Sequence, residues 1–360
     1  MKKILYLLAV VLLSAAWLLP FHKTPWTTFG SEMLTFSACI ALLVACSFDQ
    51  FKIAKPQWLA ALIILIPTVQ YATGHILYFS NAMLCVGYLL IFWLMISAGY
   101  NLSEHQGRIR VFRLFCTLLI AIGVLSSVIA IIQWLQLSPK FYPYLNTLRG
   151  NRPYANFAQP NNFATFMSMG LIGVLYFYEK RITSKYVLIP LALLFIFTIA
   201  LTQSRTSWVL CLFILIYLGI KQYSRPKHFG FAKLLLWVGV FIATISALPY
   251  INQWVGSLMD RPIVDTASVV ERASGGYLRL DMWNQALVAI GQQPWFGYGW
   301  NQTGMAQIAA FDAYPSHEWY KSAHNVILDL LIWNGIPIGL LIVLYVVGWL
   351  YWLNKGVRDI

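Results

Sequence analysis

The sequence predicts an all-α polytopic membrane protein with about ten transmembrane helices, and three observations support this fold class. Of the 360 residues, 59% are hydrophobic and only 10% are charged, with a mean hydropathy of +0.67. A soluble domain cannot bury that much apolar surface, so lipid must cover most of it. The apolar residues form unbroken runs of about 14–25 residues that do not alternate with polar ones, which favours helices over strands.

The expected membrane-spanning helices follow one another as apolar runs separated by polar residues. In chain order the runs are Ile4–Leu19, Thr28–Phe48, Trp58–Tyr71, Ile76–Ser97, Val111–Leu135, Asn162–Tyr178, Tyr186–Leu201, Ser207–Ile220, Leu234–Tyr250 and Ile336–Leu353. The first run follows Met1-Lys2-Lys3, and a signal peptide is the alternative for it. Bulky residues follow "SAAWLLP", which makes a poor cleavage site, so we expect an uncleaved first helix.

The distribution of charge orients these helices. With the N-terminus inside, the cytoplasmic ends and loops carry 16 Lys and Arg against 4 Asp and Glu, whereas the opposite face carries 9 against 8. This is the positive-inside pattern, so we expect both termini in the cytoplasm. The pattern accounts for the net charge of +13 without a nucleic-acid partner.

The cysteines indicate neither a disulfide framework nor a thiolate metal site. All five fall inside predicted spans: Cys39, Cys46, Cys85, Cys116 and Cys211. The chain also shows no internal repeat or obvious linker. We therefore expect one polytopic domain, with N-terminal transmembrane helices over residues 1–136 and a functional core over residues 137–360.

Two segments on the expected outer face, residues 137–161 and 251–323, are too long to be simple connections. Long ordered segments over a helical scaffold commonly carry function. Six of the nine basic residues on this face are arginines: Arg149, Arg152, Arg205, Arg261, Arg272 and Arg279. Arginine presents a planar, permanently charged group that suits phosphate oxygens. The alternative is that these are ordinary surface arginines paired with carboxylates such as Asp260 or Asp281.

Arg205 lies between two apolar runs with almost no connecting loop, in "ALTQSRTSWVL". It must therefore lie at the membrane boundary, where an unpaired charge is costly and often functional. It either reaches outward to lipid headgroups or binds an anionic group near the bilayer surface.

Aromatic side chains are frequent in the second outer segment: Tyr277, Trp283, Trp295, Tyr298, Trp300, Tyr314, Trp319 and Tyr320. Aromatic faces pack against the C–H faces of sugars, and they also form belts at membrane interfaces. Arginines for phosphate beside aromatics for sugar would suit a lipid-linked glycan.

The sequence favours neither a metal site nor an ATP-driven pump. His317 and His324 are seven residues apart with Glu318 beside the first, but a third convincing ligand for zinc is missing. Carboxylates on the outer face are scattered, whereas a hard divalent cation requires a cluster. No glycine-rich phosphate loop appears on the cytoplasmic side.

Four stretches together resemble the family of O-antigen ligases and bacterial protein O-oligosaccharyltransferases, in order and spacing. They are "GNRPYANFAQPNNFAT" (Gly150–Thr165), "LTQSRTSW" (Leu201–Trp208), "RLDMWNQALVAIGQQPWFGYGWN" (Arg279–Asn301) and "SAHNVILDLLIWNGIPIGL" (Ser322–Leu340). The first stretch is most similar to the branch that glycosylates pilins and other exported proteins. Members of that branch usually continue with further helices, whereas this chain stops one span later, as a short branch or a truncated product would.

The resemblance implies a helical bundle of the C-type glycosyltransferase kind, with a large periplasmic loop that carries the active site. It implies transfer of a glycan from undecaprenyl pyrophosphate to an acceptor hydroxyl, with no metal or nucleotide cofactor. By the same resemblance His324, Arg205 and Arg279 are the catalytic candidates. The expected substrate-binding residues are Arg149, Arg152, Gln159, Asn161, Trp283 and Asn325.

His324 fits the role of a base on chemical grounds as well. A serine or threonine hydroxyl is a poor nucleophile at neutral pH, and an imidazole can take its proton as attack proceeds. Gly335 and Pro337 break the apolar stretch after it, so we expect a short surface helix from about His324 to Trp333 and then one span returning inward. The alternative is a histidine at a helix end that is bonded to a neighbour.

The sequence is consistent with two classes of function, an enzyme and a transporter. The first is an inner-membrane glycosyltransferase acting on the periplasmic face, with an exported protein such as pilin, or lipid A-core, as acceptor, or with glycan polymerisation as its reaction. The second is a transporter of a lipid-linked glycan, which would bind with the same arginines and perform no chemistry. A transporter predicts charges near mid-membrane. The predicted spans hold almost none, which favours the enzyme.

Overall fold

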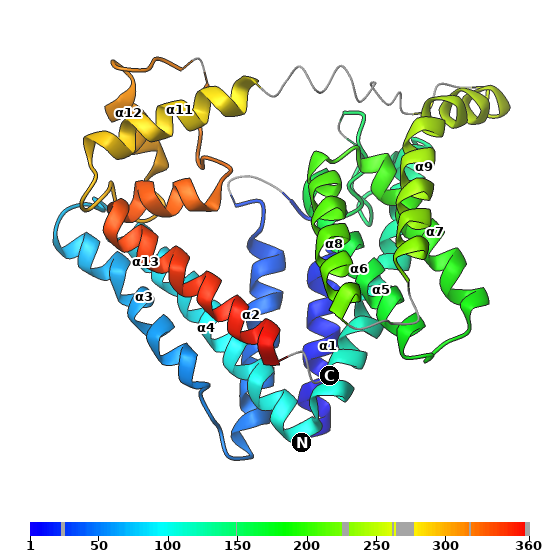
Figure 1. Ribbon diagram of the computed structural model, residues 1–360, viewed down its shortest axis with the longest axis horizontal. Helices are drawn as coiled ribbons and strands as arrows, with labels where there is room; N and C mark the ends of the chain where they lie inside the picture. Colours follow the sequence, from blue (N-terminus) through cyan, green and yellow to red (C-terminus); the bar gives the residue numbers. More distant parts are fainter. Residues whose placement is uncertain are drawn as a thin grey trace. The chain divides into compact units, whose positions relative to one another are not determined.

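The computed structural model describes residues 1–22, 26–148, 150–224, 230–260, 263, 277–316 and 318–356 (Figure 1). Within these ranges the regular elements are helices and no strand occurs, which confirms the predicted all-α class. The chain forms two compact units, each made from two separate stretches. The first unit holds Met1–Phe48 and Leu102–Val269, and the second holds Asp49–Asn101 and Val270–Ile360. The predicted division at residue 136 stays a prediction.

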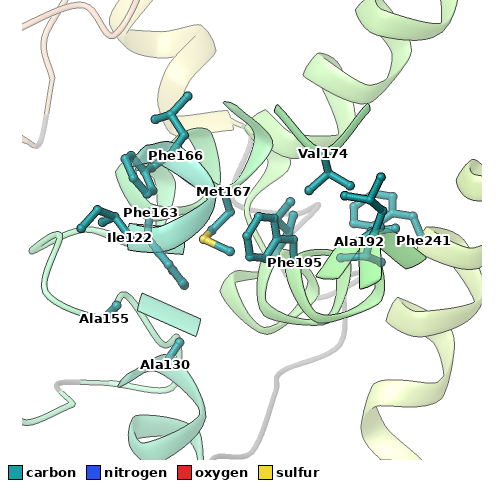
Figure 2. Close-up of a cluster of buried hydrophobic side chains, with 14 residues drawn as sticks. Ile122, Ala130, Ala155, Phe163, Phe166, Met167, Val174, Ala192, Phe195 and Phe241 are labelled. Atoms are coloured by element: carbon teal, nitrogen blue, oxygen red, sulfur yellow. The ribbon is translucent and has the colours of Figure 1, made fainter. Parts of the chain in front are cut away.

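The first unit contains seven α-helices among its described residues, together with a short 3-10 turn. They are α1 (Lys2–Leu18), α2 (Phe29–Ser47), α5 (Arg108–Trp134), η1 (Ser138–Phe141), α6 (Pro160–Glu179), α7 (Lys185–Thr202), α8 (Arg205–Ser224) and α9 (Phe231–Leu258). Phe163, Met167 and Phe195 lie at the centre of its largest apolar cluster (Figure 2). A Cβ at Gly123 or Gly170 would approach the Phe195 ring to 2.8 or 2.9 Å. These two glycines therefore let α5, α6 and α7 pack closely, as small residues do between membrane helices.

The second unit contains α3 (Lys55–Ala72), α4 (Phe79–Gln106) as far as Asn101, α11 (Tyr277–Gln292), α12 (Thr303–Ala310) and α13 (Val326–Gly356). Figure 1 shows α3, α4 and α13 running alongside one another, with α11 and α12 across one end. Polar side chains tie the long helices together. Gln57 Nε2 donates to the Trp93 carbonyl at 2.6 Å, and Tyr345 Oη donates to the Pro56 carbonyl at 2.7 Å.

Gln70, only 7% exposed, joins α3 to residues far along the chain. Its Nε2 donates to the Trp333 carbonyl at 2.8 Å, and its Oε1 accepts from the Trp300 backbone N–H at 2.8 Å. One amide side chain thereby gives the Trp300 N–H an acceptor and the Trp333 carbonyl a second donor beside the Gly299 N–H, which lies at 3.1 Å.

α13 is two helices that meet at Gly335, where the backbone leaves the helical region with φ 72° and ψ 172°. The segment Pro294–Gly299 fills the break. Tyr298 N–H donates to the Ile332 carbonyl at 2.8 Å, and Ile336 N–H donates to the Pro294 carbonyl at 2.7 Å. The break was predicted from Gly335 and Pro337, whereas the segment that fills it was not.

All ten apolar runs lie on helices, with ends that differ from the predicted ones by a few residues at most positions. The largest differences are in α4, which continues to Gln106, and α9, which continues to Leu258. Among the described helices, six are long and apolar enough to cross a membrane: Phe29–Ser47, Phe79–Gln106, Arg108–Trp134, Lys185–Thr202, Phe231–Leu258 and Val326–Lys355. A multi-helix membrane protein is therefore supported, and the count of ten crossings stays a prediction.

Candidate functional site

The predicted site residues fall into two groups, one in each unit. The first group surrounds the connection between α7 and α8, which consists of Gln203 and Ser204 alone. Gln203 adopts the left-handed conformation with φ 47°, which ends α7 and turns the chain sharply. Arg205 is then the first residue of α8, and its side chain is exposed.

Arg152 and Asn161 hold this connection in place. Arg152 Nε donates to the Thr202 carbonyl at 2.7 Å, and its terminal Nη2 donates to Asn161 Oδ1 at 3.1 Å. Ser204 Oγ donates to the same Asn161 oxygen at 2.8 Å. Both residues were predicted to bind substrate, and the structure gives each of them contacts that fix the turn before Arg205.

Arg205 itself forms no ion pair with any residue that the structure describes. The N-terminus of a helix carries partial positive charge, so a cation there is unfavourable for the helix and attractive to an anion. Gln203 and Ser207 lie on either side of Arg205 in sequence. The Gln203 amide atoms and the Ser207 Oγ are buried without hydrogen-bond partners among the described residues. Sequence reasoning missed both, although "TQSRTS" is unusually polar for a turn between two apolar runs.

Gln159 and Arg149 are the other two residues predicted for this group. Gln159 is exposed and stands directly before α6, where its side chain forms no capping bond. Arg149 lies outside the described residues.

The second group centres on His324, which is exposed and lies just before α13. The expected helix from about His324 begins instead at Val326. His324 has a left-handed backbone with φ 50°, which no helix accommodates. Asn325 caps the helix, because its Oδ1 accepts from the Ile327 N–H at 3.1 Å. The His324 imidazole has no hydrogen-bond partner in the described part of the chain, whereas its backbone N–H donates to Ser322 Oγ at 3.0 Å.

A buried carboxylate lies under the His324 loop. Asp329 is 4% exposed, and its oxygens accept from the Ala323 N–H at 2.8 Å and from Ser322 Oγ at 2.7 Å. Sequence reasoning missed Asp329 and Ser322. The signal was an acidic residue within the apolar stretch "VILDLLIWNG".

α11 brings Arg279 toward the same loop. Trp283 lies one helical turn after Arg279, so the two side chains share a face of α11. The half-buried Trp283 donates its indole N–H to the Ala323 carbonyl at 2.9 Å, which sets that face against the residue before His324. Arg279 is exposed. The structure thus groups Arg279, Trp283, His324 and Asn325 in one unit.

In the described ranges no three His, Cys, Asp or Glu side chains gather as the ligands of a metal ion would. His317, the partner considered for His324, lies outside those ranges. Arg205 in the first unit and Arg279 in the second, both predicted to bind phosphate, are exposed.

Comparisons with known proteins agree with the resemblance seen in the motifs. A family model described as O-antigen ligase matches residues 190–354, and one described as protein glycosylation ligase matches residues 153–178. The first match includes Arg205, Arg279 and His324, and the second includes Gln159 and Asn161. No solved structure shows a significant match to the chain.

Two curated proteins of Acinetobacter baylyi are similar over nearly the whole chain. A general O-oligosaccharyltransferase is 45% identical over 355 residues, which covers 98% of this chain and 62% of that protein. A ComP-specific O-oligosaccharyltransferase is 28% identical over 357 residues, which covers 97% of this chain and 63% of that protein. The chain therefore spans less than two thirds of the length of either relative. By the two family matches and the 45% identity, the chain is similar over nearly its whole length to O-antigen ligases and bacterial protein O-oligosaccharyltransferases.

Proposed function

We propose that this chain transfers a preassembled oligosaccharide from undecaprenyl pyrophosphate to a Ser or Thr hydroxyl of an exported protein such as a pilin. The 45% identity to a general O-oligosaccharyltransferase carries this proposal. The match to the protein glycosylation ligase model over residues 153–178 supports protein as the acceptor. The reaction would take place at the periplasmic face of the inner membrane, with both chain termini in the cytoplasm.

In the proposed reaction His324 acts as general base. The acceptor oxygen attacks the anomeric carbon of the glycan while its proton passes to an imidazole nitrogen. The bond from that carbon to the pyrophosphate oxygen breaks, and the lipid pyrophosphate leaves with the electron pair. An exposed imidazole that accepts and donates no hydrogen bond among the described residues suits this role.

The proposed role of the arginines is to bind the pyrophosphate and to stabilise the negative charge that grows on it. Fixed cations can supply this stabilisation in place of a metal ion. Arg205 is proposed for this role because it is exposed and lacks a carboxylate partner among the described residues. Arg279 is proposed because its helix face meets the His324 loop through Trp283.

Lipid A-core is the second candidate acceptor. It is favoured by the O-antigen ligase model, which covers the longer match, residues 190–354. His324 and the arginines would have the same roles with either acceptor. Only the identity of the glycosylated product therefore distinguishes a protein acceptor from lipid A-core.

The proposal is tested by a glycosylation assay in cells that produce the chain, a lipid-linked glycan and a candidate pilin. We expect His324→Ala to lower transfer at least about 100-fold, the usual contribution of a general base. Asp312→Ala, an exposed acidic position in the same unit, is the control and should keep wild-type transfer. Intact mass reports on the pilin and a gel reports on lipopolysaccharide.

Four results bear on the proposal. A glycan-sized mass gain that His324→Ala removes supports it. A lipopolysaccharide ladder with an unmodified pilin assigns the chain to lipid A-core ligation. Full transfer by His324→Ala contradicts the role of the histidine, and lipid-linked glycan that crosses the membrane without any covalent product indicates a transporter.

A further inference from the structure

The peptide before His324 is held from both sides. Ala323 is fully buried, with 0% of its surface exposed. Its N–H donates to Asp329 Oδ1 at 2.8 Å, and its carbonyl accepts from Trp283 Nε1 at 2.9 Å. Because the two bonds come from different helices, α13 and α11, the residue before His324 has little freedom to rotate.

Asp329 organises the rest of this loop. Its Oδ2 accepts from Ser322 Oγ at 2.7 Å, and Ser322 Oγ in turn accepts from the His324 N–H at 3.0 Å. Thr303 Oγ1 donates to Asp329 Oδ1 at 3.3 Å. A chain of hydrogen bonds therefore runs from the buried carboxylate through Ser322 to the backbone of His324.

Burying a carboxylate is unfavourable unless donors satisfy it. Asp329 is 4% exposed, and in the described part of the chain it has hydrogen-bond donors but no ion-pair partner. An apolar residue at this position in an apolar helix would avoid that penalty. The carboxylate instead satisfies backbone and hydroxyl groups of the loop that carries His324.

The backbone of His324 needs such support. Its φ of 50° is uncommon for a residue other than glycine and persists only where the surroundings fix it. A general base must also lie within hydrogen-bond reach of the proton that it removes, so displacement of the loop lowers the rate.

We infer that Asp329 and Ser322 are positioning residues that hold His324 in its reactive orientation. This inference rests on the proposed role of His324 as the base. Neither residue needs to touch the substrate, because each acts on the main chain of Ala323 or His324.

The test compares Asp329→Ala, Asp329→Asn and Ser322→Ala with the control Asp312→Asn, all in the full chain. Transfer from a lipid-linked oligosaccharide to pilin gives kcat and KM, and a thermal melt reports folding. We expect Asp329→Ala to lower kcat about 10–100-fold with KM for the donor within about twofold, by analogy with the groups that orient metal-binding histidines. Asp329→Asn should recover part of kcat, because an amide oxygen can still accept from Ala323.

A double variant separates positioning from a general loss of fold. If Asp329 acts through His324, then Asp329→Ala combined with His324→Ala should be no slower than His324→Ala alone. Multiplied losses in the double variant would overturn the inference and leave the role of His324 intact. A lower melting temperature with an unchanged kcat would also overturn it, since Asp329 would then only stabilise the fold. Full activity of His324→Ala alone would remove the proposed base and the inference with it.

Discussion

Arg152 and Arg205 show that two arginines of the same expected face can have different tasks. The guanidinium of Arg152 donates to Thr202 and Asn161, whereas Arg205 is exposed at the start of α8. The sequence predicted phosphate binding for both, because it shows their charge and their side of the membrane. It cannot show that the Thr202 carbonyl and the Asn161 side chain reach Arg152, since these contacts arise only from tertiary packing.

This difference predicts opposite effects of replacing the two residues. Arg152→Ala should lower the free energy of unfolding by about 1–3 kcal/mol, because it removes donors from two oxygens at the turn. Arg205→Gln should leave stability unchanged or raise it by about 0.3–1 kcal/mol, since it removes a cation from a helix N-terminus. Denaturation of the purified chain measures both values.

In the glycosylation assay we expect replacement of Arg205 to lower transfer more than replacement of Arg152. Arg205→Gln should lose transfer although it folds at least as well as wild type, and Arg152→Lys should keep more transfer than Arg205→Lys. Loss of stability in Arg205→Gln would contradict this division, because it would show that Arg205 has a structural partner.

The break in α13 is a contact between two pieces of backbone. A Cβ at Gly335 would collide with the Trp295 carbonyl, and one at Gly297 would collide with the Ile332 carbonyl. Both glycines also have positive φ, 72° and 65°. The sequence predicted the break from Gly335 and Pro337, but a glycine does not reveal which segment lies against it. The contact between the break in α13 and Pro294–Gly299 is therefore visible only in the structure.

Gly335→Ala should destabilise the second unit by about 1–3 kcal/mol, from the strained φ and from the displacement of Trp295. Gly348→Ala, in the second half of α13 with nothing near its Cβ, is the matched control. It should be neutral or stabilise by up to about 1 kcal/mol, because alanine favours a helix more than glycine does. Thermal melting of both variants measures the difference, and equal melting temperatures would argue against a close contact at Gly335.

The number of membrane crossings determines the side of the membrane on which each arginine lies. Ten crossings put Arg181 in the cytoplasm and Arg205 outside. If only the six helices that are long and apolar enough were to cross, α6 and α8 would not cross the membrane. Arg181 would then lie outside and Arg205 in the cytoplasm. The length of an apolar run does not settle this, because a short helix such as α1, with 17 residues, can cross where neighbouring helices or a thinned bilayer accommodate it.

Reporter fusions decide between the two topologies. We expect a phosphatase fused after residue 203 to be active and one fused after residue 182 to be inactive, with fluorescent-protein fusions giving the opposite result. This follows from the basic residues Lys180, Arg181 and Lys185, which the positive-inside rule retains in the cytoplasm. An active phosphatase after residue 182 would contradict the ten-helix topology and would place Arg205 on the cytoplasmic side.

The bonds of Gln70 have a consequence for how the protein is made. Gln70 and Trp300 are 230 residues apart. A ribosome adds about 5–20 residues per second, so about 10–50 s separate the synthesis of the two. During that interval the predicted span α3 would hold a polar amide whose final partners do not yet exist. The second unit can close only once Trp300 and Trp333 have been synthesised, and until then the Gln70 amide needs other polar groups, water or an insertion factor as hydrogen-bond partners.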